Sequence, residues 1–504
     1  MEESQSRQGF NSKVGFIIAA VGSAVGLGNI WRFPYVLYEN GGGSFLIPYF
    51  IAVFTAAIPL LILEYVIGSK FRGSSPLAFA RNHKKLEWVG WLPTFISAMI
   101  ILYYSTIISW AINYFFLSIK MSWGADTEAY FNSQFLQLST DPLSFDHFNL
   151  MIWLGLMLTW GSTYFICSRS ISSGIEKINK VLLPILGICL LFVVFRGVTL
   201  EGAVEGLNVL FTPDFALLLN PQIWLAAFSQ VFFSLSVAMG IMITYASYLP
   251  KKSDIVNTAY ITGLANSAVE FTIAIGVFGI LGYMAAENNV AVNEVVSQGV
   301  GLAFVVFPKA FNLMGGFGTY LATAFFASLV FAGFTSFISL TEAFVAPFSD
   351  KFKWPREKVY RYICLAGFLV SSVYATGAGL YILDIVDFFI NSFAIVTVGI
   401  IEAVVVAYVL KLERFKDMAN EVSIQKVGQP WIYSIKFIVP IFLTINLAFL
   451  VYTLFKEGYG GYKLEALLLY GAGTLLILCV ATVVMTKVKW KNPQDLEYDL
   501  SKGE

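Results

Sequence analysis

The segment from Gly22 to Pro34 reads GSAVGLGNIWRFP and interrupts a stretch that is otherwise apolar and long enough to cross a membrane. Three glycines, two small polar side chains and an arginine fall within it. Glycine tolerates unwound backbone, and such backbone persists inside a bilayer only where it lines a protein cavity or pathway that satisfies its N–H and C=O groups. The pattern therefore predicts a broken transmembrane helix whose break lines a binding site. A second interrupted span, FFSLSVAMGIMI from Phe232 to Ile243, lies five spans downstream.

The composition indicates an all-α polytopic membrane protein. Of the 504 residues, 57% are hydrophobic and 13% are charged, which is far too apolar for a soluble protein of this length. Apolar runs of about 20 residues, the length that crosses the hydrocarbon core of a bilayer, occur about twelve times. Their predicted limits are 15–38, 43–69, 90–119, 148–167, 174–196, 223–247, 256–284, 316–347, 358–376, 380–410, 432–456 and 465–487. We interpret 285–312, which contains three asparagines, as an external helical loop.

Lysine and arginine predict the orientation, because short loops rich in these residues stay cytoplasmic. Lys70 to Lys85 and Lys351 to Arg361 each hold five of them. The pair at 251–252, the stretch 411–426 and the tail after 487 fall on the same side if the chain has twelve spans. We therefore expect an integral protein of the cell membrane with both termini in the cytoplasm.

The sequence argues against an enzyme, a metal centre built from histidine and cysteine, a disulfide framework and nucleic-acid binding. The cysteines lie in or at the ends of spans, and the two histidines are isolated in loops. The net charge is zero, and no nucleotide-binding loop or nucleophile motif occurs in a suitable context. We expect no enzymatic activity and no organic cofactor. The residues concerned are Cys167, Cys189, Cys364, Cys479, His83 and His147.

Two interrupted helices at matching positions of two five-span halves are typical of inverted-repeat transporters, which bind substrate and ions near the membrane midplane. The chain resembles the neurotransmitter:sodium symporter family, in its prokaryotic amino-acid branch, from about Arg7 to Glu402. The resemblance implies sodium-coupled transport of an amino acid, amine or osmolyte. The motifs that carry it are SAVGLGNIWRFPY (Ser23 to Tyr35), ENGGGSFLIPY (Glu39 to Tyr49), YYSTIISW (Tyr103 to Trp110), QVFFSLSVAMG (Gln230 to Gly240), ITYASY (Ile243 to Tyr248) and FAGFTS (Phe331 to Ser336).

The resemblance also implies the organisation of the chain. Two inverted repeats of five helices each are expected at 15–196 and 223–410, with broken first and sixth helices. A cytoplasmic gate segment at 1–14 precedes them, and an external loop at 197–222 joins them. The peripheral helices at 411–487 are interpreted as lipid-facing packing or a dimer surface, and 488–504 as a cytoplasmic tail.

Two sodium sites are expected. Hard cations prefer oxygen ligands, and unwound backbone at the first break exposes carbonyls. In the family, the positions that form the first sodium site match Ala24, Asn29, Ser234 and Asn266. Those that form the second match Gly22, Val25, Ala332, Thr335 and Ser336. From the residues alone, the asparagines could instead bond between helices, and the hydroxyls could bond to their own helix.

The substrate is expected beside the first break, where a half-helix presents free N–H groups and a positive dipole end to a carboxylate. Leu27 and Gly28 supply these amides, and the family's carboxylate-binding tyrosine matches Tyr104. The ammonium is expected near the carbonyls of Ala24 and Phe233 and the hydroxyl of Ser236. The apolar subsite of the family matches Ile100, Phe233, Met239, Ser336 and Leu340.

This subsite predicts a neutral, apolar L-amino acid, because a charged side chain buried there without a partner would cost several kcal/mol. Relatives that take aromatic substrates often have glycine on both sides of the residue matching Met239. Here the first flanking residue is Ala238, which we expect to unwind less readily than glycine. Aliphatic substrates are therefore favoured over tryptophan or tyrosine.

Two charged pairs resemble the gates of the family. Arg32 and Asp387 match the external gate, and a charge inside a membrane span is functional by default. On the cytoplasmic side Arg7 is expected to pair with Asp350, and the supporting residues are Ser247 and Tyr248. Gly174 and Pro184 match the spacing at which the family unwinds the fifth span.

Glu270 follows Asn266 by one helical turn and lies in a span with no other charge nearby. In chloride-independent bacterial relatives a carboxylate at this position replaces bound chloride, beside residues that match Tyr49, Gln230 and Ser234. The sequence therefore predicts transport without chloride. Glu64 and Glu402 also match buried acids of the family and are interpreted as structural partners.

Two alternatives remain open. The first is a sodium-coupled carrier of taurine, an aminobutyrate or another osmolyte. The second is a membrane receptor of the same fold that binds an amino acid without moving it. A receptor would keep the binding positions and lose the gates, whereas both gate pairs are present in this sequence.

Overall fold

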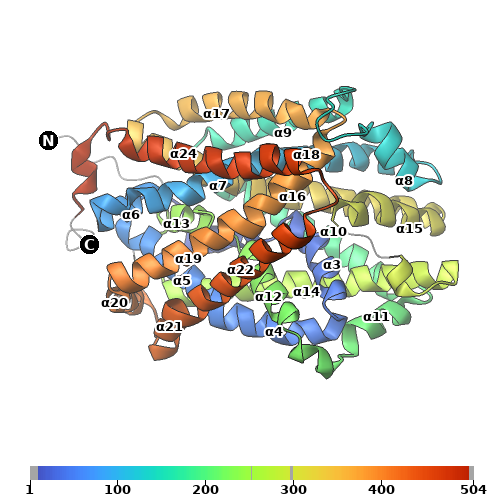
Figure 1. The fold of residues 1–504 in the computed structure, drawn as a ribbon, viewed down its shortest axis with the longest axis horizontal. Coiled ribbons are helices and arrows are strands. Elements are labelled where there is room, and N and C mark those ends of the chain that lie inside the picture. Colours follow the sequence, from blue (N-terminus) through green and yellow to red (C-terminus); the bar gives the residue numbers. More distant parts are fainter. Residues whose placement is uncertain (1–8, 251, 296–298, 499–504) are drawn as a thin grey trace.

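A computed structural model describes residues 9–250, 252–295 and 299–498, and helices joined by turns and loops make up this part of the chain (Figure 1). Within it no strand forms, and the only extended pairing is a single bridge between Phe148 and Thr376. Nine helices of the described chain are long and apolar enough to cross a membrane. The fold is therefore that of a polytopic membrane protein.

Long apolar helices form because the backbone of a membrane span must satisfy its hydrogen bonds within the helix. Five of the nine candidate spans are Gly42–Phe71 (with α4, Leu46–Ala52, and α5, Ile58–Phe71), Lys84–Ser118 (with α7, Glu87–Ser118), Leu150–Cys167 (α9), Ser172–Val198 (with α10, Lys177–Val198) and Ile255–Asn288 (α14). The other four are Gly316–Phe352 (α16), Gly379–Val409 (with α18, Gly379–Phe389, and α19, Val396–Val404), Gln429–Glu457 (with α21, Gln429–Tyr433, and α22, Val439–Glu457) and Leu464–Lys487 (with α24, Gly473–Lys487).

The core of the molecule is built around α7 and α16, which pack along each other. At their contacts Trp91 packs against Phe348 and Phe95 packs against Phe344, with ring centroids 5.7 and 6.1 Å apart. Helix α10 packs against both α14 and α16, whereas α22 and α24 leave most of their apolar side chains exposed. The latter two therefore lie at the periphery.

The first interrupted span has the predicted break. It consists of α1 (Lys13–Ala24), α2 (Leu27–Ile30) and α3 (Arg32–Glu39). Between α1 and α2 the backbone of Val25 has ψ 89° and that of Gly26 is extended, with φ −117° and ψ −167°. The half-helix α2 therefore begins inside the protein.

The second interrupted span consists of α12 (Pro221–Ser234) and α13 (Ile241–Ala246). Between them the backbone enters the left-handed region three times, at Ser236 (φ 54°), Ala238 (φ 61°) and Gly240 (φ 71°). The segment is therefore unwound even though an alanine, and not a glycine, precedes Met239. Tertiary bonds override its preference, because the Ala238 N–H donates to Glu64 Oε1 at 2.6 Å and Ser97 Oγ donates to the Met239 carbonyl at 2.7 Å.

The remaining long helix is α17 (Arg356–Ser371), continued by a 3-10 turn at Ser372–Ala375. The segment predicted as an external helical loop carries a π-helical turn at Leu302–Val306 and α15 (Phe307–Leu313). The glycine predicted to help unwind the fifth span, Gly174, lies in a π-helical turn at Ser172–Glu176 that leads directly into α10. That span is helical through Pro184 in this structure.

The basic segments gather at one end of the bundle. This basic end is formed by α6 (Ser75–Asn82), α13 and α20 (Leu412–Val422), and α8 (Thr127–Ala129), α11 (Ala203–Phe211) and α15 lie at the opposite end (Figure 1). Both ends of the described chain lie at the basic end. Phe10 N–H donates to the Tyr248 carbonyl at 3.0 Å, and Trp490 Nε1 donates to Glu87 Oε2 at 2.9 Å.

Candidate functional site

A cavity of about 1250 Å³ lies between the two helix breaks and reaches α8 and α15, so we call that end of the bundle the cavity end. Its wall contains all ten residues predicted to contact substrate. They are Ala24, Leu27, Gly28, Ile100, Tyr104, Phe233, Ser236, Met239, Ser336 and Leu340. The structure therefore brings the whole predicted set to one cavity, and their binding roles stay predictions.

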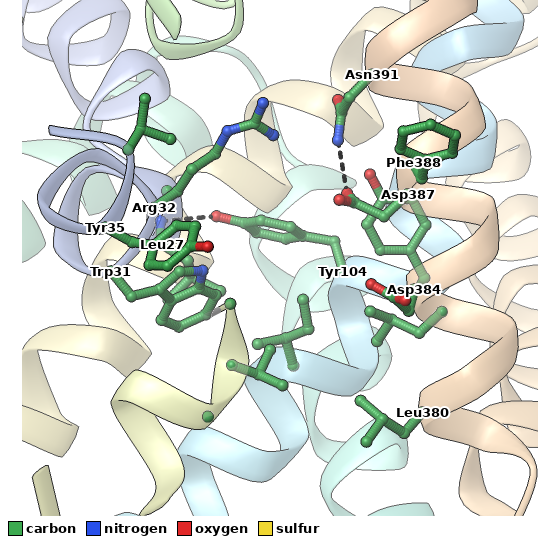
Figure 2. A pocket seen from close by; sticks show the side chains of 18 of the residues that line it. Leu27, Trp31, Arg32, Tyr35, Tyr104, Leu380, Asp384, Asp387, Phe388 and Asn391 are labelled. Carbon is green, nitrogen blue, oxygen red and sulfur yellow. Dashed lines mark hydrogen bonds between the residues drawn. The ribbon is translucent and has the colours of Figure 1, made fainter. Parts of the chain in front are cut away.

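The floor of the cavity is where the first break meets α7 and α16. The Leu27 N–H donates to the Tyr104 hydroxyl at 3.1 Å, as Figure 2 shows. A Cβ added to Gly26 would lie 2.7 Å from Ser336 Oγ and 3.0 Å from the Tyr104 hydroxyl. Glycine is thus required at this position, because any side chain would push the break away from both hydroxyls.

The side chains predicted for the first sodium site meet beneath this floor. Asn29 Nδ2 donates to Asn266 Oδ1 at 2.9 Å, and Asn266 Nδ2 donates to Ser234 Oγ. All three side chains are at most 5% exposed, and Ala24 lies on the cavity wall nearby. Three helices therefore contribute side-chain oxygens to one buried cluster, which is the donor set that a hard cation requires.

The residues predicted for the second sodium site also adjoin one another, between α1 and α16. A Cβ on Gly22 would lie 3.6 Å from the Cβ of Thr335, and Ser336 Oγ donates to the Ser23 carbonyl at 3.0 Å. The Thr335 hydroxyl bonds within its own helix, to the carbonyls of Phe331 at 3.2 Å and Ala332 at 3.0 Å. Val25 lies in the break above them and is buried.

The external gate residues Arg32 and Asp387 both line the cavity, from facing walls (Figure 2). No ion pair joins these two described side chains. The Arg32 guanidinium lies over the Phe233 ring, 4.4 Å from its centroid, and Asp387 Oδ1 accepts from Asn391 Nδ2 at 2.7 Å. The two charges therefore face the same space without contact.

The mouth of the cavity is bordered by the loop between α22 and α24. There the hydroxyls of Tyr459 and Tyr462 donate to the two oxygens of Asp384, at 3.0 and 2.9 Å. Burial, and then the charge of Asp384, raises the pKa of both tyrosines, so both stay protonated and able to donate. Sequence reasoning missed this contact because the span Gln429–Glu457 separates the partners, which are 75 and 78 residues apart in the chain.

The sequence was compared with those of known proteins. The sequence model of the Sodium:neurotransmitter symporter family matches residues 7–129 and 122–491. The chain belongs to this symporter family. An uncharacterized sodium-dependent transporter of Methanocaldococcus jannaschii is 39% identical over 96% of this chain and 98% of its own length. The sodium- and chloride-dependent GABA transporter 2 and taurine transporter of Homo sapiens are each 29% identical, over 84% and 86% of this chain and 76% of their own lengths.

Glu270, an acid within the long apolar helix α14, is completely buried and held on both oxygens. The Tyr49 hydroxyl donates to Oε2, and Gln230 Nε2 donates to Oε1 at 2.9 Å. The Tyr49 hydroxyl oxygen also lies 3.0 Å from Ser267 Oγ, which can donate to it. The structure thus brings together Glu270, Tyr49 and Gln230, with Ser234 in the adjoining asparagine cluster.

The predicted cytoplasmic gate of the symporter lies at the basic end, except that Arg7 falls outside the described residues. Asp350 Oδ2 accepts from the Ser74 N–H at 2.9 Å, and the Tyr248 hydroxyl donates to Glu342 Oε1 at 2.6 Å. Ser247 Oγ bonds to the Thr244 carbonyl, within its own turn.

Sequence reasoning missed a buried, two-pronged ion pair at the basic end. Glu342 on α16 accepts from both Nη atoms of Arg356 at 2.6 Å, and also from the hydroxyl of Tyr360. Glu342 is completely buried. An acid within the apolar span 316–347 was a signal for such a site, but Arg356 was counted only among the loop charges.

Proposed function

We propose that this family member is a sodium-coupled symporter that imports a neutral, apolar L-amino acid by alternating access and without chloride. The observation that carries the proposal is the cavity in which the two helix breaks meet. Its floor joins the backbone amides at the start of α2 and the Tyr104 hydroxyl to the Asn29–Ser234–Asn266 cluster. A carboxylate bound there would lie beside cation-binding oxygens, and a shared ligand of this kind couples sodium to substrate.

The side-chain part of the cavity supports an apolar substrate. Ile100, Met239 and Leu340 line it, and each is at most 4% exposed. A polar or charged substrate side chain would lose its hydration among them without gaining a partner. Leucine, isoleucine, valine and methionine are therefore the preferred candidates.

The environment of Glu270 supports chloride independence. In the proposed mechanism its carboxylate supplies, within the protein, the negative charge that balances the bound sodium. Tyr49 and Gln230 donate to this carboxylate in the way that they would donate to a halide ion. The mammalian relatives are named for both sodium and chloride, whereas the archaeal relative is named for sodium alone. Glu270→Ser should therefore make transport depend on chloride.

The proposal includes twelve spans arranged as two inverted repeats, with the basic end in the cytoplasm and two bound sodium ions. The broken spans at α1–α3 and α12–α13, with α17, add to the nine long helices. Lysine and arginine concentrate at the basic end, which favours that orientation. The outward-facing cavity then receives substrate from outside the cell.

A carrier of taurine or an aminobutyrate is the second candidate, because relatives at 28–30% identity bear those names. Such substrates separate the amine from the acid by additional atoms and would extend further along the cavity. A receptor of the same fold is the third, and it would bind an amino acid with sodium without accumulating it.

The test is uptake of radiolabelled amino acids into proteoliposomes that hold the purified protein. An inward sodium gradient should drive accumulation of leucine or methionine, potassium should not replace sodium, and gluconate should replace chloride without loss. Taurine or aminobutyrate uptake that leucine does not inhibit would establish the second candidate. Sodium-dependent binding without accumulation would establish the receptor.

A further inference from the structure

Asn391 is a buried polar residue of the cavity wall to which the sequence motifs assign no role. It lies in the π-helical turn Ile390–Ile395 that follows α18, one turn after Asp387. Its side chain is 7% exposed, and the residue lines the cavity (Figure 2). Its amide Nδ2 donates to Asp387 Oδ1 at 2.7 Å, whereas its Oδ1 is buried and has no hydrogen-bond partner.

The charge of Asp387 dictates how this amide is oriented. An ionised carboxylate only accepts hydrogen bonds, so the amide nitrogen must face Asp387 and the carbonyl oxygen must face away from it. A buried acceptor without a partner is unfavourable in a folded protein. Its presence beside a cavity therefore points to a donor that arrives in another state of the molecule.

The group best suited to donate to Asn391 Oδ1 is the guanidinium of Arg32, which lies across the cavity. It carries five N–H groups in a planar fork and is held here by the face of the Phe233 ring, 4.4 Å from the ring centroid. The other cation on the wall, Lys309, belongs to α15 at the outer mouth. Asp387 and Asn391 Oδ1 together offer Arg32 a set of acceptors on one wall.

We propose that Asn391 is a positioning residue of the external gate. Its nitrogen holds the Asp387 carboxylate in place, and its Oδ1 accepts a second N–H of Arg32 when the guanidinium leaves Phe233 and the gate closes. The inference rests on the proposed function in one respect, since it takes Arg32 and Asp387 as a gate. The π-helical turn supports it, because such turns re-aim side chains and occur frequently at functional sites.

Thiol accessibility tests the proposal without relying on transport. The four native cysteines are replaced by alanine, and Ile100 is replaced by cysteine as a reporter. Because α7 runs from the basic end toward the cavity end, Ile100 lies one turn deeper than Tyr104. The rate at which a charged thiol reagent labels this cysteine in sodium then reports how often the gate is open.

Asn391→Leu should raise the labelling rate about tenfold, since it removes a hydrogen bond to a charged group while keeping the side-chain volume. In the Arg32→Ala background the same change should add nothing. Asn391→Gln keeps both a donor for Asp387 and an acceptor for Arg32 and should stay within about threefold of the parent. Asn446→Leu, a change at another buried asparagine in the peripheral helix α22, is the matched control and should leave the rate unchanged.

Additive effects of Asn391→Leu and Arg32→Ala would overturn the proposal, as would a parent-like rate in Asn391→Leu. An effect of Asn391→Leu that persists without Arg32 but disappears when substrate is bound would assign Oδ1 to the substrate instead, and would also overturn it. Uptake by the parent protein distinguishes a failure of this inference from a failure of the proposed function. If uptake depends on sodium and the labelling cycle is additive, only the role of Asn391 fails.

Discussion

The two ends of the helical bundle hold their charged side chains in opposite ways. At the basic end the buried charges are paired, as in Glu342 with Arg356 and Glu87 with Lys351. At the cavity end Arg32 and Asp387 face the same cavity without an ion pair. One end of the protein is closed by ionic contacts, and the other is open.

The difference shows that burial decides which charges of the bundle need a partner. Charges removed from water must be compensated, and at the basic end Lys351, Glu87 and Glu342 are each at most 8% exposed. Charges beside an open cavity keep access to solvent, so they need no partner. Under the proposed alternating access, the cavity end must form contacts while the basic end breaks some of its own.

The largest expected effect is at Arg356. Arg356→Met leaves the buried carboxylate of Glu342 without its cation, which costs about 3–5 kcal/mol in comparable buried pairs. Arg356 Nε also bonds to the Cys167 carbonyl at 2.8 Å, so labelling of the buried Cys167 thiol should accelerate as the basic end loosens. Thermal unfolding in detergent and thiol labelling measure the two effects.

The control for this variant is the double change Glu342→Gln with Arg356→Met. It removes both charges and keeps an oxygen acceptor for one of the hydroxyls of Tyr248 and Tyr360, while the amide nitrogen can donate to the other. It should recover most of the lost stability. A double variant as unstable as Arg356→Met alone would mean that packing, and not the uncompensated charge, holds this end closed.

The next effect is at Glu87, which joins the tail of the chain to α16. Its carboxylate accepts from Trp91 Nε1 at 2.8 Å and Trp490 Nε1 at 2.9 Å, and it pairs with the buried Lys351. Glu87→Gln should cost about 1.5–3 kcal/mol, the range for a hydrogen bond to a charged group, whereas Trp490→Phe removes one neutral donor and should cost about 1 kcal/mol. Equal melting temperatures for the two variants would show that the ion pair with Lys351 contributes nothing.

Neutralising a charge at the cavity end should have the opposite outcome. Asp387 makes no ion pair with Arg32 here, so Asp387→Asn should change the free energy of unfolding by less than about 1 kcal/mol. Sodium-driven uptake should nevertheless fall by at least about tenfold, since the gate loses its charge-assisted contact. Asp384→Asn, which alters a carboxylate held by two tyrosines, is the neighbouring control. A large drop in melting temperature for Asp387→Asn would remove the contrast between the two ends.

The sequence predicted the cavity more completely than the basic end. Local pattern was sufficient at Gly22 to Pro34, because glycine spacing within an apolar run reports an unwound backbone directly. It was insufficient for Glu87, whose partner Trp490 is 403 residues away. In the sequence, a basic residue at the end of a span that contacts solvent cannot be told from one that pairs with a buried acid. Burial decides their role, and burial follows from packing between distant helices.

Ala238, between the two ends, is where local preference and tertiary contact conflict, and it gives the smallest expected effect. A left-handed conformation costs a residue with a Cβ about 1–2 kcal/mol, whereas glycine lowers stability by about 0.4–1 kcal/mol through the unfolded chain. Ala238→Gly should therefore stabilise the protein by at most about 1 kcal/mol. Thermal unfolding checks the sign, and competition uptake checks whether the freer segment beside Met239 lets tryptophan compete better with leucine. Because Glu64 and Ser97 still hold the break in the variant, a clear loss of stability would show that the alanine methyl itself supports the cavity floor.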